Sequence, residues 1–363
     1  MRVLNFFMEK NKKKKFLFVT DVWDPHICGV VTIIKNIKRE LEKQGFKVKV
    51  IHPGLFKNVS LPNYKEIKVP LFVREEVGTI IKEFNPNYIH LFTESVLGLA
   101  AKRVCRRLGL KYTTSFHTRF PEYINIRTKI PVSVTYSFLR KFHKESYRVL
   151  VSTDSLKKEL ERRNFKNLRV WRFGVDTDLF REKKWEEIRK TDLVERVSVL
   201  EKPIFVYMGR LTKEKSVEDF LALKIKKGSK LVIGGGPLGK TLKRKYRDKN
   251  VIFTGYKRGE ELVDLLSLSD YFVFPSQTDT FGLVLVEALR CNLPILAYRV
   301  QGPRDIVKEG VTGVLVENNL EEGLEDLLKI KPEKDFFAET KKMSLIESAQ
   351  NFLKYHYNNR GFS

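Results

Sequence analysis

The sequence predicts an α/β protein made of two doubly wound domains. Short apolar strands alternate with helices twice along the 363 residues, before and after a polar stretch at residues 175–202. Such alternation builds parallel sheets with helices on both faces. The length suits two domains, and a hydrophobic content of 42% supplies apolar side chains for two cores.

The first half opens on one βαβ unit. The apolar run 16–20 predicts a strand, residues 30–44 have the spacing of an amphipathic helix, and residues 47–51 predict the next strand. The same alternation predicts strands at 88–91, 111–115, 148–152 and 168–173, and helices at 97–108, 131–148 and 155–163.

The second half repeats this pattern after residues 175–202, which we interpret as a linker because they lack a clean apolar period. It predicts strands at 204–208, 230–233, 251–253, 271–274 and 295–297, and helices at 217–223, 259–268, 281–291 and 344–357. We expect one domain of residues 1–180 and another of residues 181–343. The C-terminal helix, within residues 344–363, is expected to pack back on the first domain.

The net charge of +25 predicts attraction to an anionic partner: nucleic acid, an acidic membrane surface or a phosphorylated ligand. Lysine recurs along the whole chain, so part of the excess can be compositional. Three cysteines without CxxC spacing argue against a zinc site or disulfide framework and favour a reducing compartment. No apolar run is long enough to span a membrane, and the apolar N-terminal residues precede the lysines, the wrong order for a signal peptide. We expect a cytoplasmic protein that can rest on a membrane.

The stretch 271–289 predicts an anion site. A strand, a polar loop with Asp279, the pair Phe281-Gly282 and a helix with Glu287 follow one another. The first backbone N–H groups of a helix lack internal partners and can hold phosphates, while carboxylates can accept from hydroxyls. The alternative is a buried strand and an amphipathic helix whose acids face water.

Other candidate residues also follow predicted strands. His117, Arg210 with Lys215, the glycines 234–236 and Tyr256 each come after one. Each has an ordinary alternative: a structural hydrogen bond for the histidine, surface charge for the cations and a simple turn for the glycines. Their common position favours function, since ligands of doubly wound sheets bind at the carboxyl ends of the strands.

These motifs make the chain resemble glycosyltransferase family 4, whose retaining enzymes have the GT-B fold of two Rossmann-like domains facing across a cleft. The resemblance runs from about residue 16 to residue 316. It is carried by Met208–Lys215, Phe272–Asp279, Thr280–Leu289, Gly302-Pro303 and Gly310–Leu315. The stretches 24–31, 114–123 and 173–180 are similar to a subgroup with GDP-mannose-dependent α-mannosyltransferases and sulfoquinovosyl- and glucuronosyl-diacylglycerol synthases.

The resemblance implies a role for each candidate. Arg210 and Lys215 would bind the donor diphosphate and stabilise the leaving nucleotide, where negative charge develops. Asp279 would contact the donor sugar, and Glu287 would hold the ribose hydroxyls. His117 would orient the sugar from the other domain.

Further contacts follow from the same resemblance. The remaining donor contacts would be the backbone amides of Phe281, Gly282 and Leu283, the nucleobase pocket of Tyr256 and Lys257, and the close approach of Gly29 and Val30 to the phosphates. No metal or other cofactor is needed, because cations replace it. The chain departs from the family at Asp279, commonly Glu, at Gly235, commonly acidic, and at Cys28, commonly Asn in the subgroup.

The basic residues of the first half favour a membrane. Charges at 140–144 and 157–166 are interleaved with Tyr136, Phe138, Phe142 and Tyr147, a mixture that suits an anionic bilayer. The alternative is a solvated helical face. No nucleic-acid-binding motif accompanies the charge, so we expect no nucleic-acid partner.

We therefore expect a retaining glycosyltransferase that moves a hexosyl unit from a UDP- or GDP-linked sugar to a hydroxyl of a lipid, such as diacylglycerol, or of a saccharide. Two alternatives stay open. A nucleotide-sugar 2-epimerase of the same fold would use no acceptor. A basic non-catalytic protein would bind anionic polymers or vesicles in a steeply salt-dependent manner and turn over no donor.

Overall fold

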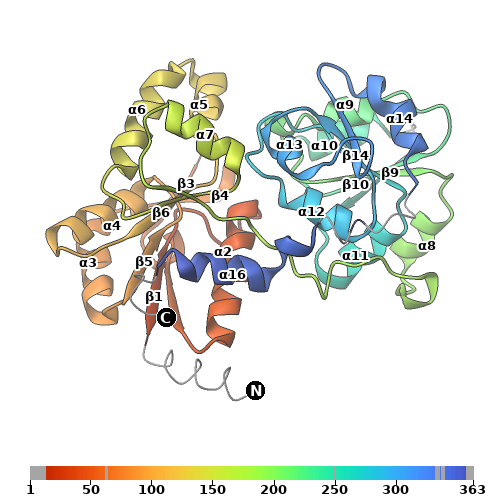
Figure 1. Ribbon diagram of the computed structural model, residues 1–363. Coiled ribbons are helices and arrows are strands. Elements are labelled where there is room, and N and C mark those ends of the chain that lie inside the picture. The colour runs from red at the N-terminus through yellow and green to blue at the C-terminus, as the bar shows by residue number, and fades with distance from the viewer. Residues whose placement is uncertain (1–13, 62–63, 248–249, 332–335, 337–339, 357–363) are drawn as a thin grey trace. The chain divides into compact units, whose positions relative to one another are not determined.

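The computed structural model describes residues 14–61, 64–247, 250–331, 336 and 340–356 (Figure 1). The chain divides into two compact units. Unit 1 comprises residues 1–174 and 345–363, and unit 2 comprises residues 175–344. The division between Gly174 and Val175 lies a few residues before the boundary predicted at 180 and 181. The N-terminal lysine run up to residue 13 lies outside the described residues.

Unit 1 is built on a six-stranded parallel sheet of order β2-β1-β5-β6-β7-β8. Its strands are β1 (Lys15–Val19), β2 (Lys47–Ile51), β5 (Tyr88–Leu91), β6 (Thr113–Phe116), β7 (Val149–Val151) and β8 (Leu168–Val170). Between β2 and β5 the chain forms a separate antiparallel hairpin of β3 (Asn58–Leu61) and β4 (Tyr64–Pro70), preceded by the short helix η1 (Pro53–Leu55).

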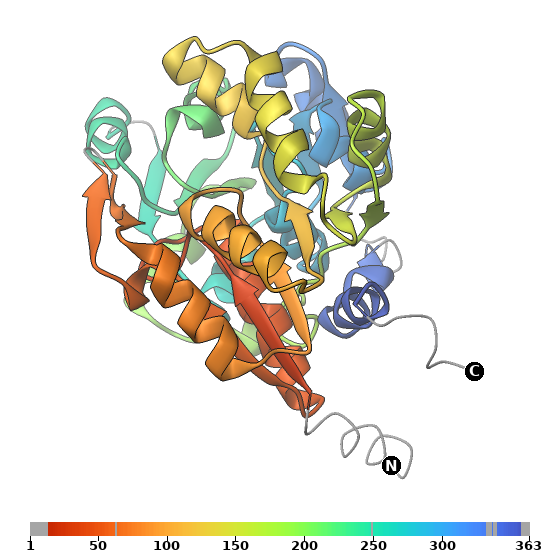
Figure 2. The ribbon, with the colours of Figure 1, turned by 90° about the vertical axis from the view of Figure 1, so that its left-hand side faces the viewer.

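Helices cover both faces of this sheet because successive residues of a strand point to opposite sides. Leu17 and Val19 of β1 join a core with α3 and α4, which lie in front of the sheet in Figure 2. Phe16 and Phe18 point the other way and pack on Phe352 of α16. The helices of unit 1 are α2 (Gly29–Lys43), α3 (Val73–Phe84), α4 (Val96–Arg107), α5 (Phe120–Thr128), α6 (Val132–His143), α7 (Asp154–Arg162) and α16 (Leu345–Lys354).

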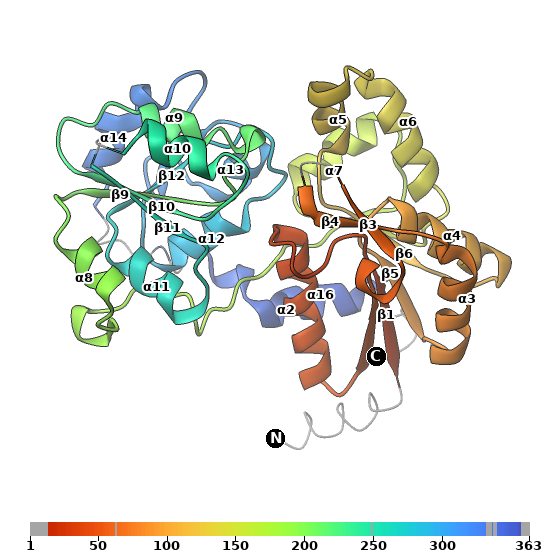
Figure 3. The same ribbon diagram turned by 180° about the vertical axis from the view of Figure 1, so that it is seen from behind.

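Unit 2 repeats the architecture with a parallel sheet of order β11-β10-β9-β12-β13-β14 (Figure 3). Its strands are β9 (Ile204–Met208), β10 (Ser229–Ile233), β11 (Val251–Gly255), β12 (Tyr271–Phe274), β13 (Ile295–Tyr298) and β14 (Gly313–Val316). Its helices are α8 (Asp192–Ser198), α9 (Val217–Ala222), α10 (Gly239–Lys245), α11 (Gly259–Ser267), α12 (Leu283–Arg290), α13 (Gln301–Ile306) and α14 (Leu324–Lys329), with η2 (Trp185–Glu187), η3 (Lys213–Lys215), η4 (Leu320–Gly323) and η5 (Lys341–Met343). The predicted fold class of two doubly wound α/β domains is confirmed.

The stretch 175–202 is not a bare linker, contrary to our interpretation. It contains η2 and α8 and belongs to unit 2. Apolar side chains and polar contacts attach it together. Phe180, Ile188, Val194 and Val197 are buried. The fully buried Asp264 of α11 accepts from Lys183 Nζ at 2.6 Å and from Arg189 Nε at 2.7 Å. The apolar residues are too irregularly spaced for a search for apolar periodicity to detect them.

Each sheet has one point where the chain changes direction along the strand order. In unit 1 the chain runs from β1 out to β2 and returns to β5 on the other side of β1. In unit 2 it runs from β9 through β10 to β11 and returns to β12 on the other side of β9. Loops leave such a switch point on opposite sides of the sheet, which makes room for a ligand at the carboxyl ends of the strands.

Candidate functional site

The switch point of unit 2 carries the predicted phosphate and sugar residues. Arg210 and Lys215 follow β9, and Asp279 follows the adjacent strand β12. Lys215 Nζ lies 2.5 Å and 2.7 Å from the two Asp279 carboxylate oxygens, and both side chains are about a fifth to a quarter exposed. The structure therefore brings a predicted phosphate-binding cation and the predicted sugar-contacting acid into one ion pair that spans the switch point.

A buried tyrosine shapes the loop that carries Arg210. The hydroxyl of Tyr207 donates to the Arg210 carbonyl at 2.8 Å. Burial and then the charge of Asp279 raise the pKa of that hydroxyl, so it keeps its proton and stays a donor. A side chain at Gly209 would put its Cβ 2.7 Å from the hydroxyl oxygen of Tyr207. The turn after β9 thus needs a glycine next to the arginine.

The glycine loop after β10 lies against this turn. Gly234 has φ of +140°, and a Cβ there would stand 1.9 Å from the Gly209 carbonyl, so only glycine fits. Gly235 lies under the ring of Tyr256, whose hydroxyl donates to the Gly235 carbonyl at 2.7 Å. A Cβ at Gly235 would meet that ring at 2.7 Å. The position of the Tyr256 ring therefore requires glycine at residue 235, where the family commonly has an acidic residue.

Lys257, predicted for the nucleobase pocket with Tyr256, is engaged locally. Its Nζ lies 2.5 Å from Glu261 Oε1, four residues along in α11. Tyr256 itself is 44% exposed. The structure therefore leaves the phenol ring of Tyr256 open at its surface while Lys257 is paired.

The start of α12 has the shape expected of a phosphate-binding turn. Gly282, which precedes the helix, has φ of +85° and ψ of 73°, in the left-handed region that favours glycine. Phe281 and Leu283 on either side of it are buried. A Cβ at Gly302, in α13, would lie 2.7 Å from the Phe281 carbonyl, so the family's Gly302 lets α13 approach the loop.

Glu287 lies one turn inside α12, where burial raises the pKa of its carboxyl to about 7. Within the described part of the chain the carboxylate has no hydrogen-bond or ion-pair partner. A buried acid without a partner favours its neutral form, and a donor hydroxyl would favour the ionised form. This environment suits an acid that is completed by a ligand.

In unit 1 the switch point is held by Asp21. Its carboxylate accepts from the backbone N–H of Leu97 at 2.7 Å and from the hydroxyl of Thr93 at 2.7 Å. Gly29 begins α2, with Val30 after it. A Cβ at Gly29 would meet no atom within 4 Å. The protein itself therefore gives no steric reason for glycine at this position, and its role beside phosphates stays a prediction.

His117 follows β6, two strands from β1 in the sheet of unit 1. Its Nε2 lies 2.6 Å from Ser115 Oγ, and its ring stacks on Phe92 at a centroid distance of 5.7 Å and an interplanar angle of 12°. Burial, and then the proximity of His143, lower the pKa of His117 to about 3. The imidazole is thus neutral at physiological pH.

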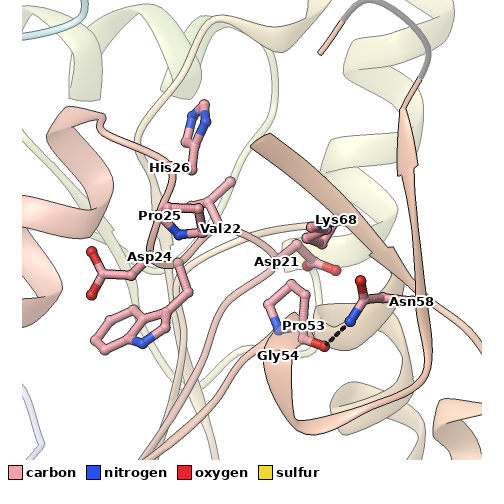
Figure 4. A pocket seen from close by; sticks show the side chains of 10 residues that line it. Asp21, Val22, Asp24, Pro25, His26, Pro53, Gly54, Asn58 and Lys68 are labelled. Carbon is pink, nitrogen blue, oxygen red and sulfur yellow. Dashed lines mark hydrogen bonds between the residues drawn. The ribbon is translucent and has the colours of Figure 1, made fainter. Parts of the chain in front are cut away.

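A pocket of about 200 Å³ opens beside the loop between β1 and α2 (Figure 4). The stretch 24–31, part of this loop, was expected only as a motif shared with the subgroup, and no role was predicted for the residues that line the pocket. They come from that loop, η1 and the hairpin: Asp21, Val22, Trp23, Asp24, Pro25, His26, Pro53, Gly54, Asn58 and Lys68. The polar and aromatic run at 21–26 was a visible signal for this pocket. The hairpin was not predicted, although Val59 and Leu61 alternate with polar residues in β3.

Among the helices of the described residues, none is long and apolar enough to cross a membrane. In the same residues, no group of three or more His, Cys, Asp or Glu side chains is arranged to hold a metal ion.

The two halves of the chain match two glycosyltransferase families. Residues 27–179 match Glycosyltransferase Family 4, and residues 189–344 match Glycosyl transferases group 1. Among proteins of assigned activity, the chain is 28% identical over 323 residues to the sulfoquinovosyl transferase SQD2 of Arabidopsis thaliana, a match that covers 82% of this chain and 62% of that protein.

Two further relatives match over more of their own length. Identity is 28% over 332 residues to a GDP-mannose-dependent α-mannosyltransferase of Corynebacterium glutamicum, covering 85% of this chain and 78% of that one. Identity is 27% over 370 residues to an α-monoglucosyldiacylglycerol synthase of Streptococcus pneumoniae, a match that covers 92% of this chain and 82% of that one.

Solved structures agree on the fold. A sucrose-phosphate synthase from Thermosynechococcus elongatus superposes with a TM-score of 0.75 at 17% identity, and Anabaena HepE in complex with UDP-glucose with a TM-score of 0.72 at 15% identity. Each match covers 94% of this chain and 98% of the other. The chain therefore belongs to the glycosyltransferases of family 4 and group 1, with the GT-B fold.

Proposed function

We propose that the protein is a retaining hexosyltransferase that uses a UDP- or GDP-linked sugar and glycosylates a hydroxyl of a membrane lipid such as diacylglycerol. The observation that carries the proposal is the Lys215–Asp279 pair at the switch point of unit 2, where Lys215 belongs to the same segment after β9 as Arg210. A diphosphate there would meet two cations, and the sugar attached to it would meet the acid.

Breaking the glycosidic bond leaves negative charge on the nucleotide diphosphate and positive charge on the sugar. Arg210 and Lys215 act on the first of these charges and lower the barrier where it develops. Phosphate oxygens also accept from the backbone N–H groups at residues 281–283, since the first amides of a helix have no internal partners. No metal is required in this scheme, because the side-chain cations neutralise the leaving group.

The remaining residues hold the two ends of the donor. Glu287 accepts from the ribose hydroxyls, and Tyr256 offers its exposed ring to the base. Asp279 orients the sugar and stabilises the oxocarbenium-like transition state. His117, neutral at physiological pH, orients the sugar by hydrogen bonding rather than by charge. The acceptor hydroxyl attacks from the face that the nucleotide leaves, without a covalent intermediate.

Names of relatives and the surface of α6 support a lipid acceptor. The Streptococcus pneumoniae relative is named for synthesis of a glucosyldiacylglycerol. Val134 and Phe138 of α6 are 57% and 46% exposed, one helical turn apart, and the last turn carries Arg140 and Lys141. An apolar strip beside cations suits the surface of an anionic bilayer.

The four aromatic residues on which the membrane hypothesis was based differ in their exposure to solvent. Tyr136 and Phe142 are buried in the core of unit 1, whereas Phe138 and Tyr147 are exposed. The proposed membrane surface therefore rests on Phe138 with Val134, and not on the whole aromatic set.

The test is nucleotide release from a panel of UDP- and GDP-linked hexoses, with and without vesicles of diacylglycerol and anionic phospholipid. We expect release from one donor class that depends on the vesicles, together with a glycolipid product of retained anomeric configuration. Release of nucleotide with conversion of the sugar and no acceptor would identify an epimerase. No release from any donor would reject the proposal.

A further inference from the structure

A chain of buried hydrogen bonds crosses unit 1 and ends at His117. It starts at His356, which follows α16, and passes through Thr113, His90 and Ser115 before it reaches His117. Thr113 and Ser115 lie two residues apart in β6 and therefore face the same side of the sheet, and His117 follows two residues after Ser115, just past the end of the strand. The chain thus joins the C-terminal helix of the unit, which lies beside α2 in Figure 1, to the predicted site residue.

Every link is short. Thr113 Oγ1 lies 2.6 Å from His356 Nε2 and 2.7 Å from His90 Nδ1. Ser115 Oγ lies 3.0 Å from His90 Nε2 and 2.6 Å from His117 Nε2. The first four members are at most 7% exposed, so water does not replace these bonds.

The direction of proton donation along this series of hydrogen bonds is set by His356, its first member. His356 Nδ1 lies 2.7 Å from the Phe352 carbonyl, which can only accept, so the proton of His356 is on Nδ1. Nε2 then carries a lone pair and must receive a proton from the Thr113 hydroxyl. The alternative acceptor for that hydroxyl, the Ile89 carbonyl, is more distant at 3.3 Å.

The remaining links follow from the single proton of each hydroxyl. Thr113 has given its proton to His356, so its oxygen accepts from His90, whose proton is on Nδ1. His90 Nε2 therefore accepts from Ser115, and Ser115 Oγ accepts from His117. The proton of His117 is then on Nε2, and its Nδ1 is a hydrogen-bond acceptor.

The hydrogen bonds from His356 to His117 keep this sequence of donors and acceptors only while the three histidines are neutral. Burial is the main cause that lowers the pKa of His356 to about 4, that of His117 to about 3 and that of His90 well below its ordinary value. Aromatic rings surround them: Phe352 lies at centroid distances of 5.0 Å from His90 and 4.1 Å from His356. Neither a charged imidazole nor water fits this environment.

We propose that this chain is a tautomer lock, in which Thr113, His90, Ser115 and His356 are positioning residues that hold the proton of His117 on Nε2. His117 Nδ1 then accepts from a hydroxyl and cannot donate to one. The catalytic meaning of the lock rests on the proposed role of His117 at the donor sugar, whereas the tautomer itself is a property of the protein without ligand.

The direct measurement is the tautomer of each histidine in full-length protein labelled with ¹⁵N-histidine, from long-range ¹H–¹⁵N correlation spectra without nucleotide. Signals are assigned with single His→Gln variants. We expect the proton on Nε2 in His117 and on Nδ1 in both His90 and His356.

The decisive variant is Thr113→Val, which keeps the side-chain shape and removes the hydroxyl. His90 would then lose the acceptor of its Nδ1 proton and would place the proton on Nε2, toward Ser115. Ser115 would in turn donate to His117, which would move its proton to Nδ1. We expect this shift at His117, two hydrogen-bonded links from the substitution, and its reversal in Thr113→Ser.

A matched control lies at the next residue. Thr114 is as buried as Thr113 and bonds to His143 Nδ1 at 2.8 Å, but its side chain is on the other face of β6. Thr114→Val should leave the tautomer of His117 unchanged. In turnover, Thr113→Val should lower kcat roughly five- to tenfold, the effect of one misdirected hydrogen bond, with little change in the KM for the donor.

Two results would overturn the lock: a His117 proton on Nδ1 in the natural protein, or a His117 tautomer unmoved by Thr113→Val. If circular dichroism shows that this variant does not fold, Thr113→Ala, which also removes the hydroxyl, takes its place, and an unmoved His117 tautomer there is equally decisive. Absence of turnover in the natural protein would reject the proposed function and leave the tautomer result intact.

Discussion

The two units have similar sheets but opposite chemistry at their switch points. In unit 2 the loop after β9, which carries Arg210, is joined to the loop after β12 by the Lys215–Asp279 ion pair. In unit 1 the loop after β1 carries Asp21, whose carboxylate is used by the first amides of α4 and by Thr93. The Asp21 carboxylate of unit 1 is therefore engaged by hydrogen bonds within the unit, whereas the Lys215–Asp279 pair of unit 2 is partly exposed.

The same contrast holds for the titrating groups. At the strand ends of unit 1, burial lowers the pKa of His117 and keeps its imidazole neutral, and the Asp21 carboxylate, whose pKa burial raises, accepts hydrogen bonds from within the unit. The strand ends of unit 2 present an ion pair and an acid, Glu287, whose pKa lies near neutrality. We infer that unit 2 is suited to an anionic ligand and unit 1 to uncharged hydroxyl groups, which is the division that a diphosphate donor and an alcohol acceptor require.

The largest effect is expected from Arg210→Ala. Removing a cation that acts on the leaving diphosphate should lower kcat/KM for the donor by about 10³-fold, or about 4 kcal/mol of transition-state stabilisation. Arg210→Lys should recover part of this, because charge returns without the planar fork. Initial rates of nucleotide release measure both. Arg244→Ala, at an exposed arginine of α10, is the control and should keep the natural rate.

A second effect, of about 10²-fold in kcat, is expected from Asp279→Asn and from Lys215→Ala. Their ion pair is partly exposed, so the same variants should lose less than about 1 kcal/mol of folding free energy. Turnover and urea unfolding of the two single variants and the double variant separate the effects. A stability loss of several kcal/mol with ordinary turnover would mean that the pair serves the fold and not the ligand.

A third effect concerns the pair of Gly235 and Tyr256. Gly235→Ala should displace the Tyr256 ring, since a Cβ there would come within 2.7 Å of it. If the ring contacts the base, nucleotide affinity should fall roughly tenfold, the size of one lost stacking contact. Calorimetric titration with UDP and GDP measures it. In the background of Tyr256→Ala the same substitution should have little further effect, and a full additional loss there would disprove the coupling.

The sequence predicted the regular core of both units well because buried strands are short apolar runs. The strands at 47–51, 204–208 and 271–274 have the predicted bounds. The hairpin of β3 and β4 and the helix α8 were not predicted. Helix α8 is seven residues long and buries only Val194 and Val197. Apolar periodicity cannot identify an element with so few buried apolar positions.

The site shows a similar limit. The positions of Arg210, Lys215 and Asp279 after adjacent strands follow from the order of elements along the chain and from the motifs. The hydrogen-bonded series that ends at His117 does not, because its members come from β5, β6 and the segment after α16. One trace was visible: the short strand Thr113–Phe116 begins with three consecutive polar residues, Thr113, Thr114 and Ser115, and all three are buried. Hydroxyl side chains in a central strand indicate a polar network, but they do not identify the partner.

A fourth effect, on stability rather than on activity, is the pH dependence that Glu287 gives to unfolding. Its pKa is raised from 4.5 to about 7 by burial, so between these values the folded protein keeps a proton that the unfolded chain has lost. The free energy of unfolding should therefore fall as pH rises from about 4.5 to about 7, by at most about 3 kcal/mol from this group. Glu287→Gln should remove that slope. Urea unfolding at pH 5 and pH 8 measures the difference, which should favour the variant at pH 8.

Nucleotide binding should reverse the preference of Glu287. Ribose hydroxyls donate to the ionised carboxylate, so a bound nucleotide lowers the pKa and releases a fraction of a proton near pH 6.5. Calorimetry in two buffers of different protonation enthalpy detects this proton, and UDP or GDP should bind more tightly at pH 8 than at pH 6. In Glu287→Gln the release should disappear. A release of the same size in that variant would assign the proton to another group and would remove Glu287 from the ribose site, leaving the contrast between the two units to rest on Arg210, Lys215 and Asp279.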